Sequence, residues 1–156
     1  MRRRVWTLSL GLLAVILCGI VVWHIHRVYY FNPFTFKQDD VTTASWNVYK
    51  TPMEMDIVYQ PVHGTQTRYT TENRSEINYV LTQLREGKPM SYKPIIGLST
   101  GQIWIQFRNP VNQNDYVDAI LRQNMKVALL AQQNPITVTS GLKRFVEAKK
   151  NSAKTM

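Results

Sequence analysis

Glu54 and Asp56 are the acidic residues of this sequence whose spacing could support catalysis. They are two positions apart in a segment where polar and apolar residues alternate, so both side chains would project from one face of a β-strand. A pair of carboxylates on one surface can serve as acid and base in hydrolysis. The same alternation also describes the polar, solvated face of a half-buried strand, which is the interpretation that we favour for both residues.

Three histidines could in principle ligate a metal or assist a nucleophile. His24 and His26 are two positions apart in an expected helix, where their side chains point to different sides and would not share one metal ion. His63 belongs to an expected loop, but no Gly-x-Ser-x-Gly motif accompanies it, and the single cysteine, Cys18, lies in an apolar segment. Glycine-rich phosphate loops and EF-hand patterns are also absent. The sequence therefore predicts no catalytic, cofactor-binding or metal-ligating residue.

The apolar segment near the N-terminus predicts a transmembrane helix over residues 5–25. It follows three arginines at positions 2–4, and the next formal charge is Arg27. About 20 helical residues, at about 1.5 Å each, span the roughly 30 Å hydrocarbon core of a bilayer. A cleaved signal peptide is the alternative, but its apolar region is shorter and ends in small residues, whereas this one ends Val-Val-Trp-His. The arginines predict that residues 1–4 are cytoplasmic and that the chain after the transmembrane helix is extracytoplasmic.

The formal net charge of +9 is concentrated at the two ends of the chain. Residues 28–142 contain ten basic and nine acidic side chains and are nearly neutral. A basic stripe interleaved with aromatic residues, which is typical of nucleic-acid-binding modules, is absent there. We therefore expect no nucleic-acid partner.

Four cations near the C-terminus form the one candidate contact site of the sequence. They are Lys143, Arg144, Lys149 and Lys150, which recur about one helical turn apart. They are either solvated charges or a patch that contacts an anionic surface such as lipid or wall polymer.

The chain beyond the membrane segment divides into a linker, one domain and a short end. Residues 26–45 predict a juxtamembrane linker, in which Phe31, Phe34 and Phe36 either rest on the membrane surface, as we expect, or pack on the domain. Residues 46–148 have the length of one compact domain, and residues 149–156 predict a basic tail.

Alternation of apolar and polar residues predicts the first strands. Residues 46–50 predict a short strand, and Met53 to Gln60 alternate at a period of two. The next strand, residues 65–70, would return after a five-residue loop from Gln60 to Gly64. That loop would pair Ile57 with Thr67 and Met55 with Tyr69 on the apolar face.

A helix with one apolar face is predicted after this hairpin. Asn73 and Glu76 form a capping pair, and a stripe at helical spacing follows: Ile77, Val80, Leu81 and Leu84. Residues 92–98 and 102–108 then predict a second hairpin, with Ile103, Ile105 and Phe107 on one face and Trp104, Gln106 and Arg108 on the other. Trp46 and Trp104 are either core residues, which we favour, or a platform for a ligand.

Residues 115–132 predict either two strands around Gln123 and Asn124 or a single helix, and we favour the strands. Ser140 is expected to cap a final helix that turns Leu142, Phe145 and Val146 inward. The predicted fold class is α+β: an antiparallel sheet of five to seven strands after a single transmembrane helix, with one packed central helix and a short C-terminal helix.

The order of these elements resembles a group of small bacterial domains. A hairpin, an Ile-x-x-Val-Leu-x-x-Leu helix, antiparallel strands and a closing Gly-Leu-Lys-Arg-Phe-Val-Glu segment are similar to uncharacterised membrane-anchored or lipoprotein domains of Gram-positive envelopes. The resemblance covers residues 54–148, implies an α+β envelope domain and carries no functional residue across.

These features favour a membrane-tethered, non-catalytic extracytoplasmic domain. Its expected partner is an envelope protein, a peptide or a wall component, and an accessory or regulatory subunit fits the same features. The alternative is an extracytoplasmic hydrolase with an unrecognised carboxylate or histidine site.

Overall fold

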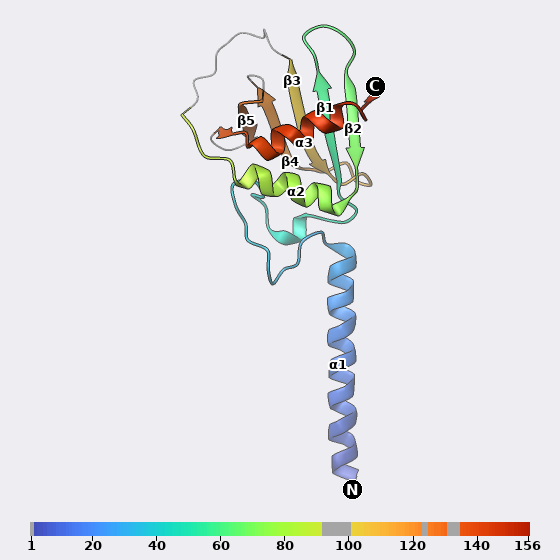
Figure 1. The fold of residues 1–156 in the computed structure, drawn as a ribbon. Coiled ribbons are helices and arrows are strands. Elements are labelled where there is room, and N and C mark those ends of the chain that lie inside the picture. The colour runs from blue at the N-terminus through green and yellow to red at the C-terminus, as the bar shows by residue number, and fades with distance from the viewer. Residues whose placement is uncertain (1, 92–100, 123–124, 131–134) are drawn as a thin grey trace.

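The computed structural model describes residues 2–91, 101–122, 125–130 and 135–156 (Figure 1). In this part of the chain, three α-helices and one seven-stranded antiparallel sheet confirm the α+β class. The helices are α1 (Arg2–Val28), α2 (Arg74–Arg85) and α3 (Ser140–Lys150), and a short 3-10 helix, η1, covers Trp46–Val48. The strands are β1 (Glu54–Gln60), β2 (Thr67–Thr71), β3 (Gln102–Arg108), β4 (Asp115–Arg122), β5 (Val127–Leu130), β6 (Ile136–Thr137) and β7 (Lys154–Thr155).

The sheet has the strand order β6-β5-β4-β3-β1-β2-β7, with the long strands β1 and β3 near its centre. Figure 1 shows α2 and α3 packed on the sheet while α1 extends away from the domain. The apolar stripe of α2 and the inner residues of α3 bury against one sheet face, together with residues of β1, β3, β4 and β5. This core includes Ile57, Leu81, Ile105, Phe107 and Leu142, each exposed by 1% or less.

Helix α1 is long and apolar enough to span a membrane, and none of its apolar window Gly11–Val28 is buried in the protein. The helix ends at Val28, and the chain then hydrogen-bonds directly to the domain. The Tyr30 amide donates to the Tyr49 carbonyl over 2.8 Å, and the Thr51 amide donates to the Val28 carbonyl over 3.0 Å. The end of α1 is therefore fixed to the domain by backbone hydrogen bonds.

The predicted juxtamembrane linker is folded into the domain rather than separate from it. Tyr30 and Val41 belong to the core, and Phe31 and Phe36 pack around the fully buried Tyr49 with ring centroids 5.1 and 5.8 Å away. The expectation that the three phenylalanines rest on the membrane is therefore wrong for Phe31 and Phe36. Phe34 alone of the three stays exposed. The reason is that both rings contact the buried Tyr49 and remove apolar area from water within the domain core.

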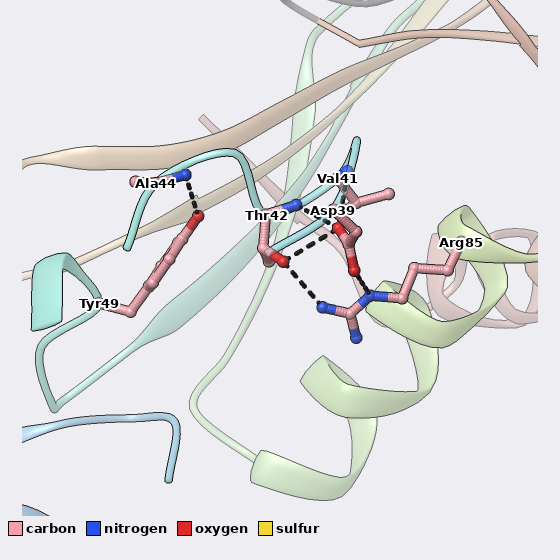
Figure 2. A network of polar contacts seen from close by, with 6 residues as sticks. All are labelled: Asp39, Val41, Thr42, Ala44, Tyr49 and Arg85. Carbon is pink, nitrogen blue, oxygen red and sulfur yellow. Dashed lines mark hydrogen bonds and ion pairs between the residues drawn. The ribbon is translucent and has the colours of Figure 1, made fainter. Parts of the chain in front are cut away.

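An ion pair fixes this segment to the C-terminal end of α2 (Figure 2). Asp39 Oδ1 accepts hydrogen bonds from the amides of Val41 and Thr42, over 2.9 and 2.7 Å, and its Oδ2 accepts from Arg85 Nε. A second Arg85 nitrogen donates to Thr42 Oγ1 over 3.0 Å. Burial alone would raise the pKa of the Asp39 carboxyl, but the hydrogen bonds from Thr42 and Arg85 outweigh burial and hold it below its usual value.

Residues 46–50 do not form the expected strand. Residues Trp46–Val48 form η1, in which the Val48 amide donates to Ser45 and the Tyr49 amide to Trp46. Lys50 pairs with Tyr29 in an isolated bridge. The Lys50 amide donates to the Tyr116 hydroxyl over 3.0 Å. The backbone of this segment therefore bonds to itself, to the residues after α1 and to a side chain of β4 rather than to the backbone of a sheet strand.

The register of the β1–β2 hairpin differs by two residues from the prediction. Ile57 pairs with Tyr69 and Met55 with Thr71, and the last cross-strand pair joins Tyr59 to Thr67, so the loop is longer than five residues. A two-residue shift keeps every side chain on the same face, so burial could not distinguish the two registers. In the observed register Thr70 lies opposite Asp56, and its hydroxyl donates to Asp56 Oδ1 over 2.5 Å.

Strand β1 is buried on both faces, although the sequence predicted a solvated polar face. Met55, Ile57 and Tyr59 face the helices as expected, but Glu54, Asp56 and Val58 are also buried. The strand lies between β2 and β3, whose long side chains cover its second face.

The predictions of α2, β4, β5 and α3 are confirmed, with one correction at the cap of α3. The Asn73 side chain accepts from the Ser75 and Glu76 amides and caps α2, and strands β4 and β5 replace the alternative single helix. Helix α3 is capped by Thr139, whose hydroxyl accepts from the Leu142 amide over 3.1 Å, and not by Ser140. The expected strand 92–98 lies outside the described residues, and the two edges of β3 pair with β1 and β4.

The C-terminal residues belong to the domain rather than to a free tail. Helix α3 continues to Lys150, and β7 pairs with the outer edge of β2 through Thr155 opposite Thr67 and Lys154 opposite Arg68. Lys149 Nζ lies 2.6 Å from Glu76 Oε1 on α2. Residues beyond 148 therefore close one edge of the sheet.

The Asp39 contacts predict a pH-dependent contribution to stability. Because the folded-state pKa of Asp39 is depressed, its contribution is present above the ordinary carboxyl pKa of about 3.9 and is lost as pH falls through the folded-state value. We expect Asp39→Asn to lower the unfolding free energy of the full chain in detergent micelles by about 1 to 3 kcal/mol at pH 7. The difference should shrink below about pH 4. Asp40→Asn, at an exposed neighbour, is the control; equal effects of both variants at pH 7 would contradict this account.

Candidate functional site

The sheet has a second face, which we call the open face, whose side chains lie outside the main core. Strand pairing assigns to it a row that crosses five strands: Leu129, Ile120, Trp104, Val58 and Arg68. Beside this row lie the polar residues Glu54, Asp56, Gln106, Arg108, Asp118 and Arg122. The core formed with α2 and α3 contains none of these side chains.

The carboxylates that the sequence marked as candidate catalysts lie on the open face, where both contact the same arginine. A terminal nitrogen of Arg108 lies 2.7 Å from Glu54 Oε1 and 3.0 Å from Asp56 Oδ2. Asp56, which is fully buried, also accepts from Thr70 Oγ1 over 2.5 Å and has Arg68 Nε at 4.0 Å. The hydrogen bonds that Arg108 donates to Glu54 raise the pKa of Arg108, and the nearby Asp56 charge adds to the effect.

This geometry makes Glu54 and Asp56 part of an ion cluster rather than a free acid and base. A general base needs a lone pair that the reacting proton can reach, whereas Asp56 is fully buried and lies within 4.0 Å of two arginines. The register supplies the arrangement, since Glu54 faces Arg108, and Asp56 lies one pair further along the strands. The cluster joins β1 to β3 and orients Arg108.

Trp104 is the most exposed apolar side chain in the row. It is 38% exposed, between the buried Val58 and the partly buried Ile120, which pair with it on either side. Its indole nitrogen donates to Gln102 Oε1 over 3.2 Å. A cavity of about 360 Å³ opens beside Trp104 and is lined also by Gln106, Asp118, Ile120 and Leu129. The open face therefore offers an aromatic surface next to a shallow hollow.

Asp118 lies in the wall of this hollow with an unused acceptor. Its Oδ1 is buried and has no hydrogen-bond partner in the described part of the chain. Burial raises the pKa of Asp118, and the nearby Asp115 charge adds to the rise, while a hydrogen bond from Gln106 opposes it. A buried polar atom without a partner is costly, so a donor on a bound molecule would be favoured at this position.

The histidines are not brought to the open face. His63 lies in the loop after β1 and Glu54 begins that strand, so the length of β1 separates them, which is six residue steps of about 3.3 Å or roughly 20 Å. His24 and His26 lie in the last turns of α1. In residues 2–91, 101–122, 125–130 and 135–156, no group of three His, Cys, Asp or Glu residues could hold a metal ion. The structure thus assembles no metal or nucleophile site from the residues that the sequence marked.

The four C-terminal cations point in different directions on α3. Lys149 contacts Glu76, and its ammonium group lies 4.9 Å from the Tyr69 ring centroid. Lys143 and Lys150 line a separate cavity of about 570 Å³ together with Glu147, which lies 4.0 Å from Lys143. Arg144 is exposed and donates to the Ser140 carbonyl over 3.4 Å. The structure does not gather them into the compact patch that their spacing indicated.

The two tryptophans differ in environment. Trp46 packs edge-on against Tyr29, with ring centroids 4.7 Å apart, at the junction with α1. Trp104 is exposed on the open face, so its expected role as a core residue is wrong. The sequence had placed Trp104, Gln106 and Arg108 on one strand face, but their neighbours Asp118 and Ile120 follow only from the register of β3 with β4.

Comparison with known proteins adds no functional assignment. No protein family, curated protein or solved structure matches this chain. The candidate site is therefore defined by its geometry: an aromatic surface and hollow on the open face, supported by the arginine–carboxylate cluster.

The cluster predicts strong coupling between Arg108 and Asp56. We expect Arg108→Met to lower the unfolding free energy of the full chain by about 1 to 3 kcal/mol, because it leaves a buried carboxylate without its closest cation. Combining it with Asp56→Asn should recover part of that loss in a double-mutant cycle measured by denaturant unfolding. Arg144→Met, at an exposed cation, is the matched control, with an expected change within about 0.5 kcal/mol. Equal costs for both arginine variants, with no coupling to Asp56, would contradict the cluster's role.

Proposed function

We propose that this protein is a single-pass membrane protein of the cell envelope whose extracytoplasmic domain binds a protein or peptide through its open face. The apolar helix α1 supports the anchor, and the arginines at positions 2–4 support a cytoplasmic N-terminus. The role is non-catalytic, as an accessory or regulatory subunit. Anchoring raises the concentration of the domain near partners in the same membrane.

The observation that carries the binding role is the exposed Trp104 at the centre of the open face. Tryptophan and arginine are enriched among the residues that dominate binding energy at protein interfaces, where a hydrophobic centre is surrounded by polar groups. Trp104 has apolar neighbours in Val58, Ile120 and Leu129, while Asp118 and Gln106 provide hydrogen-bonding groups at the rim. This is the composition of a small interface centre.

The geometry favours binding over hydrolysis. Glu54 and Asp56 are held by Arg108. Among the described residues that line the cavity beside Trp104, Asp118 is the one carboxylate. Glycoside hydrolysis, for comparison, needs two carboxyl groups that face each other across the bond to be cleaved. We therefore advance no enzymatic function beside the binding role.

The proposed topology can be tested with a reporter. A reporter enzyme that is active only outside the cytoplasm, fused after Met156, should be active in intact cells, because the three N-terminal arginines hold the other end inside. Exchanging these arginines for glutamines should reduce that activity and raise the signal of a cytoplasmic reporter at the same position. Cytoplasmic activity of the unaltered chain would contradict the topology.

The binding role predicts a specific effect of Trp104. A photo-crosslinking residue at position 104 of the full chain in its native membrane should capture one dominant partner, and the same residue at Val62, in the exposed loop after β1, should not. Trp104→Ala should weaken association with that partner by about tenfold or more, as loss of an interface hot spot does. Tyr79→Ala, at a comparably exposed aromatic on α2, is the control. Unchanged association in a folded Trp104→Ala protein would overturn the proposed role.

A further inference from the structure

The junction between α1 and the domain contains a cavity whose two walls are hydrogen-bonded to each other. One wall is the last turns of α1, with Trp23 and Arg27, and the other comes from Lys50, Thr51 and the loop after β3. Two hydrogen bonds fix the walls to each other, from Thr51 N and Thr51 Oγ1 to the carbonyls of Val28 and Arg27. The loop is ordered by Asn109, whose side chain accepts from the Val111 and Asn112 amides over 2.9 and 3.2 Å. The cavity measures about 540 Å³.

The charge of this cavity is positive and is not neutralised by its own lining. Arg27 and Lys50 contribute two cations, and none of the described lining residues is Asp or Glu. Both cations lie over aromatic rings: the Lys50 ammonium is 3.8 Å from the Tyr29 ring centroid and the Arg27 guanidinium is 5.2 Å from that of Trp23. A cation–π contact with a neutral ring does not neutralise the side chain, so its positive charge can still attract an anion. Thr51 and Asn112 add polar groups beside them.

The height of the cavity matches the headgroup layer, if α1 spans the membrane as proposed. Arg27 lies two residues beyond the expected end of the apolar span at residue 25, and Lys50 bridges to Tyr29, four residues beyond it. At about 1.5 Å per residue these positions are roughly 3 and 6 Å outside the hydrocarbon core. Headgroup regions add about 5 to 7 Å on each side of that core. The two cations therefore lie at the level of the lipid phosphates.

Apolar side chains line the same cavity as the two cations. Trp23 is 60% exposed and Val111 is 79% exposed, and both line the cavity. Aromatic rings are favoured at the boundary between acyl chains and headgroups, and an exposed valine there would contact the upper part of a lipid rather than water. An anionic phospholipid supplies both kinds of contact, a phosphate for the cations and an apolar glycerol-ester region for Trp23 and Val111.

We propose that this junction cavity binds the headgroup of an anionic phospholipid, with Arg27 and Lys50 contacting its phosphate. This inference rests on the proposed membrane anchor, but it does not depend on the partner of the open face. The bound lipid would hold the base of the domain against the membrane surface. Because the walls are fixed to each other, the site needs no rearrangement before a lipid binds.

The experiment compares lipid retention by the full chain in nanodiscs of phosphatidylcholine and phosphatidylglycerol at three to one. Lipids that stay bound when the disc is removed are counted by native mass spectrometry. We expect phosphatidylglycerol to be enriched over its bulk share, and the Arg27→Gln, Lys50→Gln double variant to reduce this enrichment by about tenfold. The control is Arg144→Gln with Lys150→Gln, which removes the same charge from exposed positions on α3 and should leave the enrichment unchanged. Loss of Arg27 does not weaken the positive-inside bias, because this residue lies on the outer side of the proposed span.

Four other results would each contradict the proposal, and they can be told apart. Equal enrichment in the double variant and the wild-type chain would exclude Arg27 and Lys50 as the lipid contacts. Equal loss in both double variants would show general charge attraction instead of a site. Binding of inorganic phosphate to the detergent-solubilised chain, with no enrichment of phosphatidylglycerol, would identify a free anion as the ligand. Release of the chain from membranes by alkaline carbonate would overturn the anchor, and this inference with it.

Discussion

Burial of the chain between α1 and β1 is the interaction on which the rest of the structure depends. Tyr30, Val41 and Tyr49 are core residues, and Thr42 is fully buried beside them. Each large apolar side chain buried in this way stabilises a fold by about 1.5 to 3 kcal/mol, and the backbone bonds between Tyr30 and Tyr49 and between Val28 and Thr51 direct the chain. The helix and the sheet are consequently one unit, and every surface of the domain has a fixed direction relative to α1.

Because this direction is fixed, the surfaces of the domain differ in their distance from the end of α1. Figure 1 shows α3 on the side of α2 away from α1, so the C-terminal cations on α3 are remote from the end of the helix. The cations that lie at that end are Arg27 and Lys50, beside the exposed Val111. The open face, in contrast, belongs to the sheet itself and is rigid, because β3 is paired on both edges and Arg108 ties it to β1. A partner on that face would meet a surface that needs little ordering on binding.

Local patterns in the sequence were sufficient for the elements that bury one face. The stripe of α2 and its Asn73 cap follow from hydrophobic period and cap residues alone. The same patterns favoured the strands β4 and β5 but left a single helix open as the alternative. The apolar α1 follows from length and composition.

Features that depend on contacts distant in sequence were not predictable from these patterns. The register of β1 with β2, in which Asp56 meets Thr70, was mispredicted because a two-residue slip leaves the hydrophobic pattern unchanged. Burial of Asp56 depends on Arg108, which is 52 residues away. The docking of the segment between α1 and β1 involves Asp39 reaching Arg85 across 46 residues. In the candidate site, the alternation around Trp104 was visible, but its neighbours Ile120 and Asp118 required the pairing of β3 with β4.

Hydrogen exchange of the full chain in lipid nanodiscs tests most directly whether helix and domain form one unit. The amides of Tyr30 and Thr51 donate to carbonyls across the junction, so we predict that they exchange as slowly as the amides in the middle of α2. A flexible tether would leave them unprotected. Exchange of both amides at the rate of an unstructured peptide, with β1 and β3 still protected, would contradict the account.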